Sequence, residues 1–142
     1  MSKMIISCVL MTLAAIQYGL VPPLVDLSDS HVFHPEWPPH ARFHLVWLLA
    51  VNSTVAVVVL KLIWWPSPNR AANIKIAGWL GLIVLSGFYV ALVSIDGYGG
   101  AMSDVADPPK MFGIDGNTFG FSIAAVLQVL GLMLIYRADE NA

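Results

Sequence analysis

The chain has 142 residues, of which 58% are hydrophobic and only 11% are charged, and its formal net charge is −2. Soluble domains carry about 25% charged residues, so this composition excludes an ordinary soluble protein and predicts an integral membrane protein. The few scattered basic residues also exclude a nucleic-acid-binding protein, which would carry a basic patch or stripe.

Four apolar stretches follow one another along the chain, at about residues 4–25, 41–65, 74–95 and 118–136. Each is close to the ~20 residues that a helix needs to cross a bilayer. The runs are continuous, whereas the strands of a membrane barrel alternate in segments of about ten residues. Because little sequence remains between them, we predict an all-α fold, with one four-helix membrane bundle forming a single domain over residues 1–142.

The first apolar stretch has some features of a signal peptide, because Lys3 precedes it. It is longer than the ~7–15 apolar residues of such a peptide, and no small-x-small cleavage site follows it. We therefore expect it to be retained as the first transmembrane helix. It contains the single cysteine, Cys8, so an intramolecular disulfide bond is excluded.

The basic residues predict the orientation of the bundle, because lysine and arginine are enriched in cytoplasmic loops. With four spans, one end of the bundle receives Lys3, Lys61, Arg70, Lys75 and Arg137. The other end receives only Arg42 and Lys110. We therefore expect both termini to be cytoplasmic, in a multi-pass protein of the plasma (inner) membrane.

All four histidines lie in the segment HVFHPEWPPHARFH, residues 31–44, between the first two apolar stretches. Proline fixes φ and restricts the residue before it, so the first part of this segment is expected to be stiff and extended. Pro38 and Pro39 are placed to open the second helix, where a missing N–H has no cost. His40 and His44 then lie one turn apart on one face of that helix.

This histidine cluster predicts a metal site, because neutral imidazole is a common ligand of zinc, copper and iron. The predicted ligands of this transition metal are His31, His34, His40 and His44. Glu36 would act as a further ligand or as an acid/base group, and Asp26 or an aspartate of the loop at about residues 96–117 could also complete the ligand set. Arg42 would hold an anionic or carbonyl group of a substrate. Two other interpretations stay open: amphipathic histidines at the membrane surface, and a proton relay or ligand-binding site without metal.

The same segment resembles a motif of small four-helix membrane proteins from bacteria and fungi, H-x2-[NH]-P-x-W-P-P-H-A-R-F-H. In that family asparagine is typical at the position of His34. The resemblance implies the four-helix fold and a shared site that depends on His31, His40 and His44 more than on His34, but it implies no particular reaction. In size and number of spans the chain also resembles small anthrone-oxygenase-like membrane proteins.

The loop at about residues 96–117 is rich in glycine, aspartate and proline and is long enough to be functional. We expect it to fold over the histidine segment. The aspartates that could orient a histidine from this loop are Asp104, Asp107 and Asp115. Asn117 or Thr118 is expected to cap the last helix.

Small residues in the last two apolar stretches predict close contacts between helices. The candidates are Gly78, Gly81, Gly87, Gly120 and Ala124. No ionisable residue lies near mid-bilayer, which argues against a proton-coupled transporter.

These observations together predict a membrane-embedded, metal-dependent enzyme that acts on a lipophilic small molecule from the bilayer at the non-cytoplasmic end. An oxidoreductase is favoured over a hydrolase, because nitrogen ligands suit redox metals and no serine or cysteine nucleophile with a base stands out. The alternative is a non-catalytic membrane subunit, or a haem-, metal- or quinone-binding protein of a larger complex. A homo-oligomer is also left open.

Overall fold

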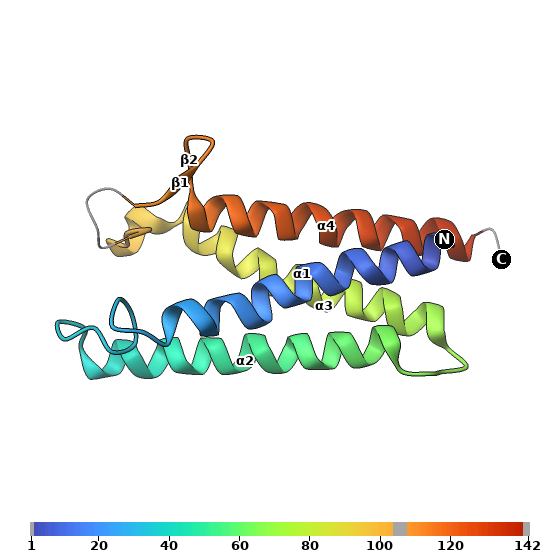
Figure 1. Cartoon of the computed structure of the whole chain (residues 1–142), viewed down its shortest axis with the longest axis horizontal. Helices are drawn as coiled ribbons and strands as arrows, with labels where there is room; N and C mark the ends of the chain where they lie inside the picture. Colours follow the sequence, from blue (N-terminus) through green and yellow to red (C-terminus); the bar gives the residue numbers. More distant parts are fainter. Residues whose placement is uncertain (1, 104–107, 141–142) are drawn as a thin grey trace.

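The computed structural model describes residues 2–103 and 108–140 and contains four long helices that run side by side (Figure 1). These helices are α1 (Lys3–Asp26), α2 (Pro39–Trp64), α3 (Arg70–Val93) and α4 (Gly116–Asp139). The connection from α3 to α4 contains a short 3-10 helix, η1 (Ile95–Tyr98), and a hairpin of β1 (Lys110–Met111) and β2 (Ile114–Asp115). The prediction of four helices is therefore confirmed.

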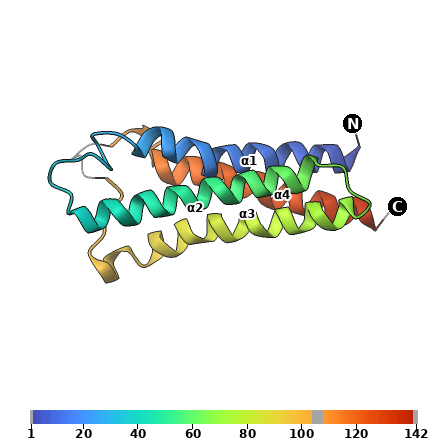
Figure 2. The same cartoon turned by 90° about the horizontal axis from the view of Figure 1, so that it is seen from below.

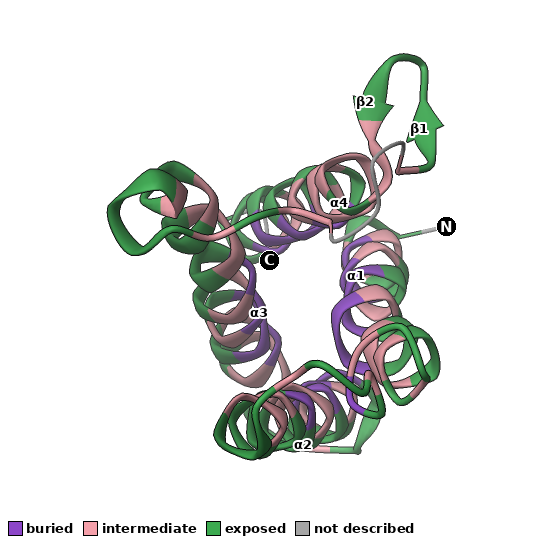
Figure 3. Cartoon of the chain, turned by 90° about the vertical axis from the view of Figure 1, so that its left-hand side faces the viewer, coloured by how far each residue is buried: buried purple, intermediate pink, exposed green. Residues whose placement is uncertain are grey.

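Consecutive helices run in opposite directions, so the chain has two distinct ends (Figures 1 and 2). Both termini and the connection from α2 to α3 lie at one end, called here the terminal end. The histidine segment and the connection from α3 to α4 lie at the other end, called here the loop end. Seen from the loop end, the helices form a ring in the order α1, α2, α3, α4, with buried residues on its inner side (Figure 3).

All four helices are long and apolar enough to cross a membrane by length and composition. Large apolar side chains also cover the outside of the ring on every helix. Examples are Leu24, Val57, Ile83 and Val126, which are 73%, 66%, 64% and 58% exposed. Such a surface is unfavourable in water and suits lipid, so the chain has the architecture of a multi-pass membrane protein.

Small residues allow the helices to approach closely. A Cβ atom at Gly19 would lie 2.2 Å from Cβ of Ala56, and one at Gly78 would lie 2.4 Å from Cδ1 of Leu132. The predicted close contact is confirmed for Gly78, whereas a Cβ at Gly87 would have nothing within 4 Å. Gly87 therefore lies outside the helix contacts, contrary to the prediction.

Polar side chains inside the bundle bond mainly to backbone carbonyls of neighbouring helices. Ser7 Oγ donates to the carbonyl of Gly131 at 2.6 Å, and Gln128 Nε2 donates to that of Gly78 at 2.8 Å. These bonds tie α1 to α4 and α4 to α3. They satisfy groups that water cannot reach in a membrane interior.

The cap of α4 differs from the prediction. Asp115 is the N-cap residue, and its Oδ1 accepts from the amides of Asn117 at 2.9 Å and Thr118 at 3.1 Å. Asn117 and Thr118 therefore lie inside the helix, where their amides are the unpaired donors that a cap must satisfy.

Candidate functional site

The histidine segment is held by turns and by one arginine. The amide of Val32 donates to the carbonyl of Asp26 at 3.0 Å, which turns the chain back over the end of α1. Arg42, in the first turn of α2, donates from Nε to the carbonyl of Trp37 at 3.1 Å. Its Nη2 donates to the carbonyls of His34 at 2.5 Å and Pro35 at 3.3 Å. The carbonyl groups that Arg42 holds thus belong to its own loop.

His40 and His44 form a pair on the first turns of α2, as their spacing predicts. Their Nε2 atoms lie 3.0 Å apart, and their ring planes are nearly perpendicular, at 86°. The ring of His44 also stacks on that of Trp47, with centroids 5.9 Å apart. Both histidines are exposed.

The remaining predicted residues lie elsewhere. His31 lies beside Asp26 at the end of α1, and Nδ1 of His34 accepts from the amide of Glu36 at 3.3 Å. The Glu36 side chain is exposed. Among the residues that the structure describes, no group of three or more histidine, cysteine or acidic side chains could hold a metal ion. The structure therefore does not bring the four histidines into one group, and it places His40 and His44 in contact.

Asp26 and His31 form the second group, in which Asp26 was expected only as a further metal ligand. Oδ1 of Asp26 lies 3.8 Å from Nε2 of His31, and the two side chains are 22% and 38% exposed. Trp37 packs edge-on against the imidazole, with centroids 5.8 Å apart. This packing holds the ring in one orientation beside the carboxylate.

A chain of serine hydroxyls determines which nitrogen of His31 carries the proton. Ser28 Oγ donates to the carbonyl of Val25 at 2.7 Å, because a carbonyl can only accept. The hydroxyl of Ser30, 2.9 Å from that of Ser28, must then donate to it. Ser30 Oγ is therefore left to accept from Nδ1 of His31, 2.9 Å away. Neutral His31 thus has its proton on Nδ1, and Nε2 is an unprotonated acceptor facing Asp26.

Two adjoining cavities at the loop end contain this pair, with volumes of about 600 Å³ and 280 Å³. Together they are called here the loop-end chamber. The residues shared by both cavities are Val25, Asp26, His31, Gly116 and Asn117. The larger cavity is also lined by Trp37 from the histidine segment and by Met102 and Pro108 from the connection to α4. The described part of this connection therefore lines a cavity together with the histidine segment.

The smaller cavity extends between the helices and combines apolar walls with a few amides. Phe88 and Phe121 stack in it with centroids 4.1 Å apart, and Gln17 and Asn52 also line it. Oε1 of Gln17 is buried without a hydrogen-bond partner. An unpaired buried acceptor is costly, so this atom is suited to a donor group on a bound molecule.

Two of the three loop aspartates cannot be placed, because Asp104 and Asp107 lie outside the described residues. Asp115 lines the larger cavity, but its carboxylate is occupied in capping α4. The carboxylate beside a histidine is instead Asp26. The signal for it in the sequence is its position at the end of an apolar run, five residues before His31.

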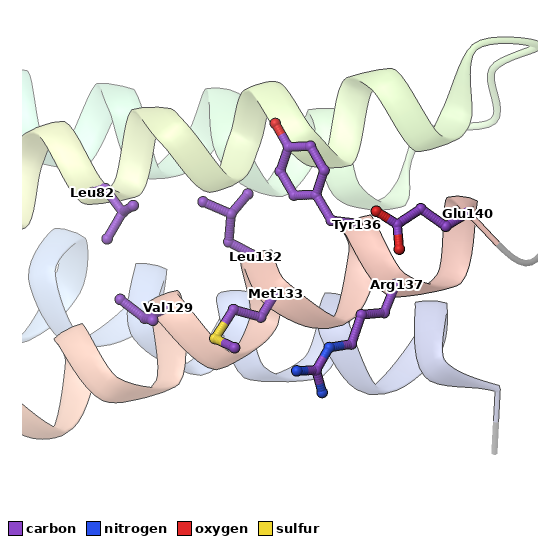
Figure 4. Close-up of a pocket in the computed structure, with 7 residues that line it drawn as sticks. All are labelled: Leu82, Val129, Leu132, Met133, Tyr136, Arg137 and Glu140. Atoms are coloured by element: carbon purple, nitrogen blue, oxygen red, sulfur yellow. The ribbon is translucent and has the colours of Figure 1, made fainter.

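A third cavity, of about 400 Å³, lies on α3 and α4 at the terminal end (Figure 4). Its lining residues are Leu82, Val129, Leu132, Met133, Tyr136, Arg137 and Glu140. No histidine lines this cavity. Lys75 and Asp139 form an ion pair at 2.5 Å that joins α3 to α4 at the same end. The histidines are therefore confined to the loop end.

Comparison with known protein families gives one match, which covers residues 10–138. The chain belongs to the family of unknown function DUF6640. The DUF6640 match spans most of α1 and α4, all of α2 and α3, and the whole loop-end chamber. No curated protein and no solved structure matches the chain.

Proposed function

We propose that this protein is a membrane-embedded enzyme that binds a lipophilic molecule in the loop-end chamber and removes a proton from its hydroxyl group. The observation that carries the proposal is the placement of two acceptors, Nε2 of His31 and Oδ1 of Asp26, 3.8 Å apart at the chamber. Two acceptors face one another favourably only when a proton lies between or beside them. A ligand hydroxyl would supply that proton.

The proposed step is a simple proton transfer. The O–H bond of the ligand breaks, an N–H bond forms at Nε2 of His31, and the products are an oxyanion and an imidazolium. The carboxylate of Asp26 stabilises the imidazolium, while the serine hydroxyls keep Nδ1 protonated throughout. Positioned general bases of this kind contribute about 10²- to 10⁴-fold to a reaction rate.

The lining of the chamber supports a lipophilic ligand with more than one polar group. Its total volume lies in the range of about 300–1,000 Å³ that is typical of small-molecule sites. Val21 and Leu48 line the smaller cavity and are also 42% and 55% exposed on a surface suited to lipid. A ligand can therefore reach the chamber from the bilayer. Oε1 of Gln17 would accept from a second donor group on the same ligand.

The proposal can be tested with an alkyl-substituted nitrophenol, a lipophilic phenol whose absorption changes on ionisation. We expect the protein in lipid nanodiscs to bind this probe as the phenolate, and His31→Gln to bind it as the neutral phenol or to lose it. His44→Gln is the matched control, because His44 lies outside the chamber lining, and it should behave as the unsubstituted protein. Equal phenolate formation in His31→Gln would contradict the proposal. Tight binding without proton uptake in the unsubstituted protein would favour the alternative of a non-catalytic binding subunit.

A metal-dependent oxidation stays a second candidate, supported by the pair on α2. Two nitrogens bound to one metal at about 2.0–2.1 Å are about 2.9–3.4 Å apart at octahedral to tetrahedral angles. The 3.0 Å between Nε2 of His40 and Nε2 of His44 fits this range. The pair would supply two ligands to copper, zinc or iron, with further ligands from water or another molecule. Elemental analysis tests this: the double variant His40→Gln/His44→Gln should lose copurified metal, and His34→Gln should retain it.

The membrane context is part of the proposal. We infer that the terminal end is cytoplasmic and that the protein resides in the plasma (inner) membrane, because five basic residues lie at or near this end. We also infer that the histidine segment is a motif shared across DUF6640, since residues 31–44 lie inside the matched region. Reporter fusions at the C-terminus test the orientation, and the residues at positions 31, 40 and 44 in other family members test the motif.

A further inference from the structure

The hairpin between α3 and α4 has an unusual turn. Lys110 pairs with Asp115 and Met111 with Ile114, so the turn consists of Phe112 and Gly113 alone. Both turn residues have positive φ, 54° at Phe112 and 81° at Gly113. Asparagine, aspartate or glycine is favoured at the first of these positions, and a bulky side chain there is strained. We therefore expect a contact of the Phe112 ring to offset the strain of its backbone.

The tip of the hairpin is apolar and exposed. Met111, Phe112 and Ile114, together called here the hairpin tip, are 51%, 90% and 46% exposed. The hairpin projects sideways from the bundle on the side of α4 (Figures 1 and 3). In water, most of this apolar surface would be solvated unfavourably.

The depth of the hairpin tip follows from its contact with α4. The rings of Phe112 and Phe119 lie 5.8 Å apart, and Phe119 is in the first turn of α4. At the terminal end of the same helix, the hydroxyl of Tyr136 accepts from the indole of Trp79 at 3.3 Å, an aromatic pair typical of a membrane surface. Seventeen residues separate Phe119 from Tyr136, which is about 25 Å along the helix. Since the hydrocarbon layer is about 30 Å thick, Phe119 lies at its edge when Tyr136 lies at the opposite surface.

We propose that the hairpin tip inserts into the lipid leaflet at the loop end and anchors the connection from α3 to α4 there. The partner is the bilayer itself, at the boundary between headgroups and acyl chains, where short apolar groups beside a spanning helix are stable. The amide of Gly116 donates to the carbonyl of Pro109 at 3.0 Å and closes the base of the hairpin. Because Pro108 and Pro109 line the chamber, the anchor also fixes part of its wall.

Site-directed labelling tests the proposal without reference to any ligand of the chamber. The single native cysteine, Cys8, is fully buried, so folded protein carrying Phe112→Cys should take up an environment-sensitive dye at position 112 only. The unsubstituted protein is the labelling control. If it takes up dye, the labelled variants are made in a Cys8→Ala background. Val93→Cys, 83% exposed on α3, is the reference for lipid, and Asp29→Cys in the exposed loop is the reference for water.

In vesicles that contain bromine-labelled lipid, we expect the dye at position 112 to be quenched as at Val93 and to emit at shorter wavelength than at Asp29. Iodide in the aqueous phase should quench it much less than at Asp29. Quenching by iodide to the extent seen at Asp29 would overturn the proposal. A short-wavelength emission that lipid does not quench and that depends on protein concentration would also overturn it, in favour of contact with another protein molecule.

Discussion

Replacing Asp26 by asparagine removes one negative charge beside His31 with almost no change in side-chain size. At 3.8 Å, the attraction between the carboxylate and an imidazolium is about 1 kcal/mol in water and about 4 kcal/mol at an effective dielectric constant of ~20. Because the His31 side chain is 38% exposed, solvent screening places the loss in the lower part of this range, at about 1–2 kcal/mol. In this variant, the equilibrium constant for proton transfer to His31 should therefore be about 5- to 30-fold lower.

The absorption of the bound nitrophenol measures this quantity directly. In Asp26→Asn the ratio of bound phenolate to bound phenol should fall by that factor, while in His31→Gln the phenolate should disappear. Asp29→Asn is a matched control, since Asp29 is exposed in the adjacent loop and lines neither cavity of the chamber. An unchanged ratio in Asp26→Asn, with the probe still in the chamber, would refute the reasoning that the pair shares a proton.

Three further predictions concern stability, each measured by thermal unfolding in detergent. Arg42→Lys should destabilise by about 1.5–3 kcal/mol, because an ammonium cannot replace the planar fork that holds the carbonyls of residues 34, 35 and 37. Gly19→Ala should cost about 1–3 kcal/mol by overpacking against Ala56, whereas Gly87→Ala should be neutral or stabilising by up to ~1 kcal/mol. Asp115→Ala should cost about 0.5–2 kcal/mol through loss of the α4 cap. An unchanged midpoint in Arg42→Lys, Gly19→Ala or Asp115→Ala would contradict the contact assigned to that residue. A lowered midpoint in Gly87→Ala would contradict its place outside the helix contacts.

The helices were predictable because the physical signal is strong and local. Continuous apolar runs near the thickness of a bilayer leave few alternatives to a helix. The helix ends were harder to predict from the sequence. α3 begins at Arg70 rather than near residue 74, because a polar first turn can extend a helix beyond its apolar part. Asp115 was missed as the cap of α4, since asparagine and threonine further along the chain are also good capping residues.

The candidate site was predictable in place but not in arrangement. The concentration of histidines indicated the loop end, and the spacing of His40 and His44 predicted their contact, which the helix repeat imposes. The separation of His31 from this pair depends on turns in the loop and on the hydrogen bonds of Arg42. Such contacts are set by three-dimensional packing, so sequence patterns do not reveal them. For the same reason, Arg42 was predicted to hold a substrate and was found to hold its own loop.

The bonds between helices are unevenly distributed along the bundle. In the terminal half, Trp64 donates to Thr12 at 2.9 Å, Ser7 to Gly131, and Lys75 pairs with Asp139. Toward the loop end, Ser53 donates to the carbonyl of Gly19 at 2.7 Å and joins α2 to α1. There, the described bond between α3 and α4 side chains is the longer one from Tyr89 to Ser122, at 3.2 Å. Polar contacts thus join α3 to α4 through an ion pair at the terminal end and through a longer hydrogen bond toward the loop end. We expect a ligand to enter the loop-end chamber by a separation of α3 from α4 at that end, while the ion pair of Lys75 and Asp139 keeps these two helices together at the other.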